Sequence, residues 1–218
     1  MTTINVNFTH NFCESRIYGK PEIVNSFTSL FISILPFFYG FPKSKSLRRI
    51  FYILIFNGLS SSYYHYYLNW FGKHLDEISM ILATYIGIYK LFLFFPWRDK
   101  FPIFLLDLYF LLMLSINTIP EYDFLFPFLF AINIFTLLYL IIELEKILHI
   151  GNKCLFISLI GFICWLISEI FCNEYLYLGH AVWHILFPLG FLQYIYNLDI
   201  SIPELNEYKK KMFKIKNK

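Results

Sequence analysis

Two histidines stand four residues apart in the segment His180-Ala-Val-Trp-His184. If this segment is helical, the spacing places both imidazoles on one face, one turn apart. A helical pair of this kind suits two ligands of one zinc ion. His65 can supply a third imidazole from another helix, and three neutral histidines leave a fourth tetrahedral position open, as in catalytic zinc sites. The alternative is a set of core histidines that are held by hydrogen bonds.

A hydroxyl and a carboxylate accompany these histidines. Ser61 precedes His65 by one helical turn on the same face, so its hydroxyl can donate to an oxygen at the metal. Serines also line helix contacts in membranes, which is the alternative role for Ser61. Asp76 follows across a short loop, where a carboxylate can accept a proton from water and later protonate a leaving amine. Asp76 could equally cap the N-terminus of the next helix, and the two roles are compatible.

The chain that positions these groups has 218 residues, of which 58% are hydrophobic and 15% charged. Soluble domains carry about 25% charged residues, so this composition is wrong for a water-soluble globule. Seven apolar stretches approach the roughly 20 residues of a membrane-crossing helix: 23–42, 50–72, 78–96, 101–118, 124–142, 154–168 and 175–198. The sequence therefore predicts an all-α polytopic membrane protein. Its seven-transmembrane-helix bundle spans 22–198, between an outer segment 1–21 and a basic tail 199–218.

The positive charges orient this bundle. With the N-terminus outside, fourteen Lys and Arg residues fall on the inner side and three on the outer side. Because cytosolic loops are rich in Lys and Arg, we expect a lumenal N-terminus and a cytosolic C-terminus. Lys90 belongs to neither side, and Asp107 lies at a similar depth in the next stretch. A lone charge is poorly tolerated there, so we expect these two residues to form a buried ion pair.

Three blocks of the sequence share their residue types and spacing with one known family. The first is Asn11-Phe12-Cys13-Glu14, followed by Glu22-Ile23-Val24-Asn25-Ser26. The second is Ser61-Ser62-Tyr63-Tyr64-His65, with Leu75-Asp76-Glu77-Ile78-Ser79-Met80. The third runs from Trp165 to Cys172 and continues in His180-Ala-Val-Trp-His184-Ile185-Leu186. These blocks resemble the alkaline ceramidases, which are seven-helix members of a superfamily of membrane metal-dependent hydrolases.

The resemblance implies a role for each candidate residue. Zinc would be bound by His65, His180 and His184, while Ser61 would stabilise the oxyanion and Asp76 would act as general acid and base. The substrate would be ceramide, cleaved at its amide to a sphingoid base and a fatty acid. Two cysteines match those of the first and third blocks and fall on the expected outer side, where oxidation is permitted. We therefore predict a disulfide that joins Cys13 to Cys172.

The family also has a calcium site near its N-terminus, built from acidic and amide oxygens. In this chain Asn11, Glu14 and Glu22 are the residues that remain of it. Phe12 stands where the family has tryptophan, and Arg16 stands where an asparagine ligand is expected. Because calcium needs several hard oxygen ligands, these replacements weaken the expected site.

Two other functions remain open at this point. One is a heptahelical receptor or sensor with a structural zinc, of the progestin/adiponectin receptor type. The other is a related hydrolase that acts on a lipid ester. For the leading hypothesis we expect an endoplasmic reticulum or Golgi membrane. The lysines of the basic tail are interpreted first as a solvated cytosolic segment, and the alternative is that Lys214 and Lys216 form a dilysine-type retrieval signal.

Overall fold

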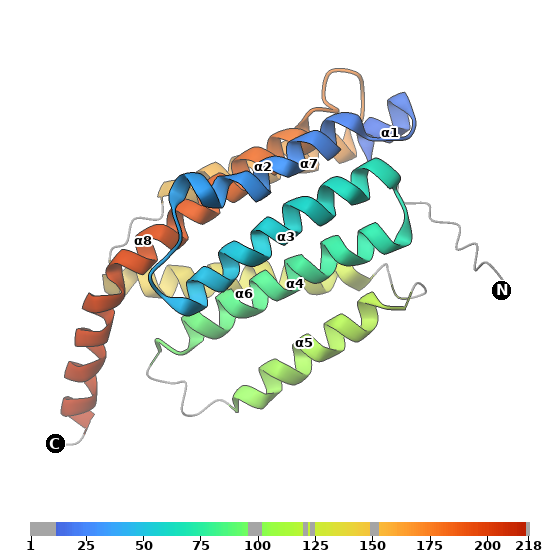
Figure 1. Cartoon of the computed structure of the whole chain (residues 1–218). Helices are drawn as coiled ribbons and strands as arrows, with labels where there is room; N and C mark the ends of the chain where they lie inside the picture. The colour runs from blue at the N-terminus through green and yellow to red at the C-terminus, as the bar shows by residue number, and fades with distance from the viewer. Residues whose placement is uncertain (1–11, 96–101, 120–121, 123–124, 149–152, 217–218) are drawn as a thin grey trace.

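The computed structural model describes residues 12–95, 102–119, 122, 125–148 and 153–216. In this part of the chain a short helix is followed by seven longer ones (Figure 1). Their bounds are α1 Cys13–Tyr18, α2 Ile23–Tyr39, α3 Lys45–Tyr67, α4 Trp70–Phe92, α5 Ile103–Asn117, α6 Phe126–Leu148, α7 Lys153–Ile170 and α8 Gly179–Lys216. The prediction of an all-α chain is confirmed.

The turn between α3 and α4 corrects the predicted position of Asp76. Leu68 adopts a positive φ of 45° and ends α3, and the chain reverses so quickly that α4 starts at Trp70. Asn69 is the N-cap, and its side chain accepts a hydrogen bond from the Gly72 amide at 2.7 Å. Asp76 therefore lies in the second turn of α4, and its expected role as the helix N-cap was wrong.

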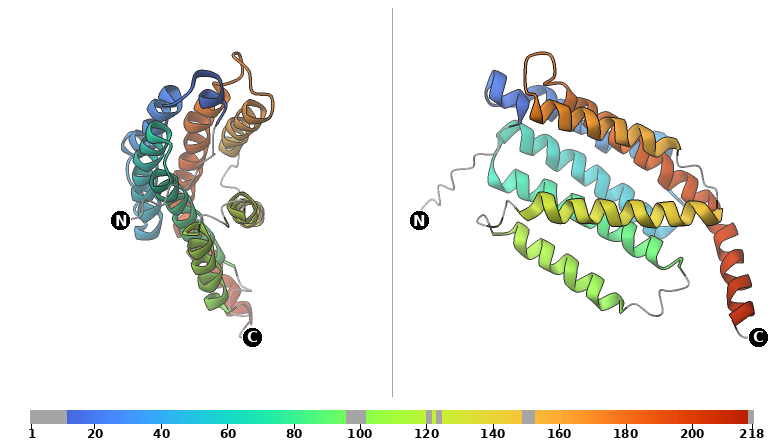
Figure 2. Two further views of the ribbon diagram at one scale, coloured as in Figure 1. Left: turned by 90° about the vertical axis from the view of Figure 1, so that its right-hand side faces the viewer. Right: turned by 180° about the vertical axis from the view of Figure 1, so that it is seen from behind.

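Helix α8 extends beyond the predicted end of the bundle. It continues without interruption from Gly179 to Lys216 and so passes the boundary expected between 198 and 199. Pro203 lies within it, and a proline inside a helix removes a backbone hydrogen bond and favours a bend. Figure 2 shows the C-terminal part of α8 leaving the other helices at an angle.

Small residues bring the central helices close together. A Cβ added at Gly58 of α3 would lie 2.8 Å from the Ser29 carbonyl oxygen of α2, and one added at Gly190 of α8 would lie 2.8 Å from the Ser158 amide of α7. Backbones that approach this closely are typical of helix packing in membranes. Helix α8 consequently lies against both α7 and α2, whereas α3 lies between α2 and α4.

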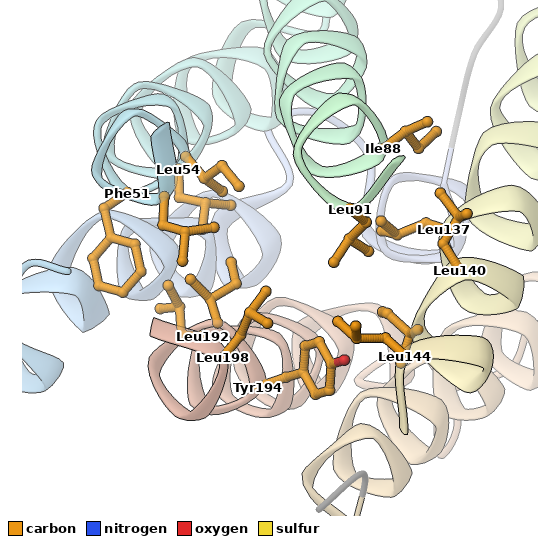
Figure 3. Close-up of a cluster of buried hydrophobic side chains, with 14 of the residues drawn as sticks. Phe51, Leu54, Ile88, Leu91, Leu137, Leu140, Leu144, Leu192, Tyr194 and Leu198 are labelled. Carbon is orange, nitrogen blue, oxygen red and sulfur yellow. The ribbon is translucent and has the colours of Figure 1, made fainter. Parts of the chain in front are cut away.

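A cluster of apolar side chains fills the half of the bundle that lies nearer the start of α3 and the end of α4 (Figure 3). We call this the apolar half. Its members come from α2 to α6 and from α8, and they include Phe51, Leu54, Ile88, Leu91, Leu137, Leu140, Leu144, Leu192, Tyr194 and Leu198. Burial of these side chains in close contact joins these helices into one body.

Several helices are apolar enough to cross a membrane. Among the described residues, Phe128–Ile147, Lys153–Ile170 and Gly179–Pro203 meet criteria of length and hydropathy, and Ile23–Tyr39 and Ile103–Asn117 are shorter apolar helices. Along α7, the buried residues are Ser158, Gly161 and Ser168, whereas its large apolar side chains are mostly exposed. A helix that buries small residues and exposes large apolar ones is suited to a lipid environment.

The expected ion pair between Lys90 and Asp107 does not form. Asp107 instead accepts a hydrogen bond of 2.7 Å from the Tyr85 hydroxyl, which joins α5 to α4. Lys90 directs its ammonium over the Phe94 ring, 5.2 Å from the ring centroid. A tyrosine hydroxyl on α4 therefore binds the carboxylate, and the lysine of the same helix does not pair with it.

Candidate metal centre

Three imidazoles meet where α3 ends and α8 begins. His65 lies in the last turn of α3, while His180 and His184 occupy successive turns at the start of α8. The ring centroids are 4.9 Å apart for His65 and His180, 5.0 Å for His65 and His184, and 4.7 Å for the two rings on α8. One nitrogen from each ring lies within 4.8 Å of the others, and the side chains are buried. The cluster could hold a metal ion.

The orientation of His65 is fixed by Glu22, the residue directly before α2. His65 Nδ1 lies 2.6 Å from Glu22 Oε2, and Glu22 is fully buried. A carboxylate 2.6 Å from the ring nitrogen accepts the Nδ1 proton, which leaves Nε2 of His65 as a potential metal ligand.

Glu169, in the last turn of α7, faces the first histidine of α8. His180 Nδ1 is 3.3 Å from Glu169 Oε1. This contact is longer than the one between Glu22 and His65, and the Glu169 side chain is 18% exposed whereas that of Glu22 is 0% exposed. Each carboxylate nevertheless approaches Nδ1 of its own histidine. His65 and His180 therefore both have Nε2 available for a metal.

Two hydroxyls of α2 border the third imidazole. His184 Nδ1 lies 3.1 Å from the Thr28 hydroxyl oxygen and 3.2 Å from that of Ser29. Thr28 donates to the Val24 carbonyl at 2.8 Å, and Ser29 donates to the Asn25 carbonyl at the same distance. A hydroxyl has one proton to donate, so both oxygens can accept from His184 Nδ1. The Ser29 hydroxyl oxygen also lies 3.4 Å from His184 Nε2. With the Ser29 proton donated to Asn25 and Nδ1 as the donor of the ring, Nε2 keeps its lone pair.

The N-terminal helix covers the cluster. The Phe12 ring, at the start of α1, lies with its centroid 4.4 Å from that of His180 and 5.1 Å from that of His65. A disulfide joins Cys13 to Cys172, which follows α7. This covalent link holds α1 against the end of α7, so an aromatic ring limits access to the imidazoles from that side.

Ser61 and Asp76 both lie beside the imidazoles. Ser61 is buried one turn before His65, and its hydroxyl oxygen lies 3.2 Å from that of Ser29. Asp76 accepts a hydrogen bond of 2.9 Å from the Asn57 side-chain amide. Asn57, Ser61 and His65 follow one another at intervals of four residues and so lie on one face of α3. Asp76, which is bound to Asn57, therefore lies against the face of α3 that carries Ser61 and His65, and it is not a member of the grouped metal ligands.

The residues expected to bind calcium have other partners. Glu14 accepts hydrogen bonds from the backbone amides of Val24 and Asn25, at 2.7 and 2.8 Å, and so binds the first turn of α2. Glu22 accepts from the Phe12 amide and from His65. Asn11 lies outside the described residues. N–H donors thus hold both carboxylates in place, and the calcium site stays a prediction.

Sequence patterns did not identify the residues that orient the imidazoles. Thr28, Ser29 and Glu169 were not assigned roles from the sequence, and Glu22 was assigned only to calcium. One signal was present, because Asn25, Ser29 and Ser33 recur every four residues on one face of the mainly apolar α2. For Glu169, nothing in the local sequence indicates that the loop before α8 brings His180 back to it.

Comparisons with known proteins find a matching family model and several relatives. A family model described as Ceramidase matches residues 5–217. An alkaline ceramidase of Caenorhabditis briggsae is 27% identical over 217 residues, covering 83% of this chain and 76% of the relative. The alkaline ceramidase of Caenorhabditis elegans matches to the same extent. Alkaline ceramidase 3 of Mus musculus is 28% identical over 204 residues, covering 81% of this chain and 76% of the relative.

Proposed function

The chain belongs to the alkaline ceramidase family of hydrolases, and we propose that it cleaves the amide bond of ceramide to give a sphingoid base and a fatty acid. The observation that carries this proposal is the buried group of His65, His180 and His184. Each of these rings has an oxygen partner at Nδ1, so all three can turn Nε2 toward a common ion.

The donor set fits zinc. Three neutral imidazoles are typical ligands of a catalytic zinc ion, with one coordination position left for water or substrate. When bound, zinc makes water nucleophilic at neutral pH and polarises a carbonyl oxygen. His65, His180 and His184 would hold the ion, and their burial would keep competing water molecules away from it.

Asp76 is the group that moves protons in this proposal. Its carboxylate accepts a proton from the attacking water, and it returns that proton to the nitrogen of the leaving sphingoid amine. The C–N bond of the amide breaks, water supplies the oxygen of the new carboxylate, and the two products separate. The hydrogen bond from Asn57 holds Asp76 in place while this transfer occurs.

Ser61 stabilises the negative charge that develops during the reaction. Addition of water turns the amide carbonyl oxygen into an oxyanion, and a hydroxyl donor beside it lowers the energy of that state. The buried Ser61 hydroxyl is adjacent to Ser29, which itself borders His184. A donor placed here stabilises the transition state more than the bound substrate, which is the condition for catalysis.

The protein is an integral membrane protein, and its lipid substrate is expected to enter from the bilayer. We propose that α2 to α8 cross the membrane seven times, with α1 on the lumenal side and the basic C-terminal tail in the cytosol. The uneven distribution of Lys and Arg supports this orientation, and the endoplasmic reticulum or Golgi is the proposed compartment. Glycosylation acceptor sites inserted before α1 and after α8 test it, because only the lumenal site should be modified.

The decisive experiment measures hydrolysis by the purified protein in detergent. Fluorescent ceramide and a matched lipid ester are supplied before and after a zinc chelator, and zinc is then restored. The proposal expects ceramide cleavage that the chelator abolishes and zinc recovers. Bound zinc without turnover of either substrate would favour a receptor or sensor. Cleavage of the ester alone would favour the related ester hydrolase.

A further inference from the structure

Glu169 of α7 contacts both the next helix, α8, and the helix α1 at the other end of the sequence. Its Oε1 faces His180 Nδ1 at 3.3 Å, and its Oε2 is 2.7 Å from Nη2 of Arg16 in α1. The same carboxylate accepts a hydrogen bond from the Cys13 amide at 3.1 Å. Arg16 also donates to the Glu169 carbonyl oxygen at 2.9 Å. One side chain at the end of α7 thus contacts both the N-terminal helix and the metal-binding face of α8.

Close packing of α7 on α8 creates this arrangement. A Cβ at Gly179 would collide with the Cys164 carbonyl oxygen, and it would lie 2.6 Å from the Ser168 Cβ. Glycine at this position therefore lets the start of α8 lie directly on the end of α7. Glu169, next to the fully buried Ser168, can then reach the first imidazole of α8.

A disulfide holds α1 against the end of α7, where Glu169 contacts Cys13 and Arg16. Cys13 and Cys172 are bonded to each other, and Cys172 lies three residues after Glu169. The disulfide therefore keeps the Cys13 amide and the Arg16 guanidinium within hydrogen-bonding distance of the Glu169 carboxylate. Arg16 is 41% exposed in its side chain, so its ion pair lies at the surface while His180 is buried.

We propose that Glu169 is a positioning residue for His180, and that Arg16 and the Cys13 amide fix the orientation of Glu169 from the N-terminal helix. This inference rests on the proposed zinc site. A carboxylate that accepts the Nδ1 proton fixes both the tautomer and the ring orientation, and it makes Nε2 a better ligand. Arg16 contributes by holding Oε2, which turns Oε1 toward the imidazole.

Zinc affinity tests the proposal directly, through competition with a chromogenic chelator. Loss of a carboxylate partner to a metal-binding histidine typically weakens binding about 10- to 100-fold, and we expect a value in this range for Glu169→Gln. Arg16→Gln should weaken binding by about two- to fivefold, as expected from the energy of an exposed ion pair. Arg16→Lys keeps the charge and should restore most of the loss. Glu174→Gln changes an exposed carboxylate in the neighbouring loop and should leave the affinity unaltered.

A second readout separates positioning from simple loss of structure. Cobalt in place of zinc gives an absorption spectrum that reports on ligand geometry, and Glu169→Gln should shift that spectrum at full occupancy. Unchanged affinity and an unchanged spectrum in Glu169→Gln would overturn the proposal. If Glu169→Gln does not fold, the Arg16→Gln variant provides the test. Wild-type zinc affinity in Arg16→Gln would equally refute the proposal that the N-terminal helix positions His180 through Glu169. These measurements need no turnover, so failure of ceramide hydrolysis alone would count against the proposed function and leave this result standing.

Discussion

The two ends of the helix bundle bury different kinds of side chain. Where α3 ends and α8 begins, the interior holds His65, His180 and His184, together with the hydroxyls and carboxylates that bind them. We call this the histidine end. The apolar half contains leucines, isoleucines and aromatic rings that contact each other without directed bonds (Figure 3). The same helices, α3, α4 and α8, contribute to both regions.

This difference shows how one bundle combines function with stability. Directed hydrogen bonds fix individual atoms, so the loss of one partner at the histidine end leaves a buried polar atom unsatisfied. Apolar contacts are less specific, and a core tolerates changes of shape as long as its volume is filled. We therefore expect substitutions at the histidine end to alter chemistry, and substitutions in the apolar half to alter stability.

The largest effect should follow from removal of a metal ligand. His184→Ala takes away one of three nitrogens, so zinc should be lost from the purified protein and ceramide hydrolysis should fall to background. Metal analysis and the fluorescent assay measure both. His74→Ala serves as the control, since His74 lies on α4 outside the cluster and contacts the Asn117 carbonyl oxygen. Retention of either zinc or activity in His184→Ala would refute its assignment as a ligand.

The next largest effect should separate turnover from metal binding. Asp76→Asn removes the proposed proton acceptor and should lower the turnover rate about 100- to 10,000-fold. Zinc content should stay unchanged, because Asp76 is not among the grouped ligands. Asp107→Asn, a carboxylate on α5 bound by Tyr85, provides the control and should retain activity. Loss of zinc in Asp76→Asn would indicate that this residue binds the metal.

A smaller effect should come from the carboxylate that orients His65. Glu22→Gln keeps the size of the side chain but replaces an ionised acceptor, so zinc affinity should fall about 10- to 100-fold. Competition with a chelator measures the change. The matched control is Glu143→Gln on α6, where the carboxylate pairs with Lys146 at the surface. Equal zinc affinity in the two variants would mean that Glu22 does not orient the ligand.

The smallest effect on the metal should come from the apolar half. Leu192 is fully buried on α8, two turns beyond His184. Its replacement by Ala leaves a cavity and should lower the free energy of unfolding by about 2 to 5 kcal/mol, measured by denaturant titration in detergent. Zinc affinity under folding conditions should equal that of the wild type. A change in affinity would show that the two regions are coupled, contrary to the comparison above.

Much of the fold was predictable because its signals are local. Apolar stretches between charged residues predicted the long helices, since burial of backbone polar groups in lipid requires helical hydrogen bonding. Helix ends were less predictable. The boundary before Asp76 was wrong by two turns because Asn69 and the positive φ of Leu68 begin α4 much earlier than its charged residues suggest. The seven crossings and their orientation stay predictions.

Pairings between distant residues were the least predictable part. Lys90 and Asp107 have opposite charges at similar depth, yet the aspartate accepts its hydrogen bond from Tyr85 instead of pairing with the lysine. Charge and depth do not determine the direction in which a side chain points around its helix. The same limitation hid the contact between Glu22 and His65, in which a residue expected to bind calcium orients an imidazole instead.

The sequence by itself determined the chemical types of the site. A His-x-x-x-His pair on a helix, a further histidine and an aspartate after it specify nitrogen ligands and a proton carrier, because helical periodicity fixes which of them share a face. Only the tertiary structure decided which oxygen orients each ring. Glu22, Glu169 and Thr28 reach their histidines through the close crossing of α2, α3, α7 and α8. Such contacts depend on interhelical distances of a few ångströms, which are set by packing across the whole bundle and are not encoded in any one segment.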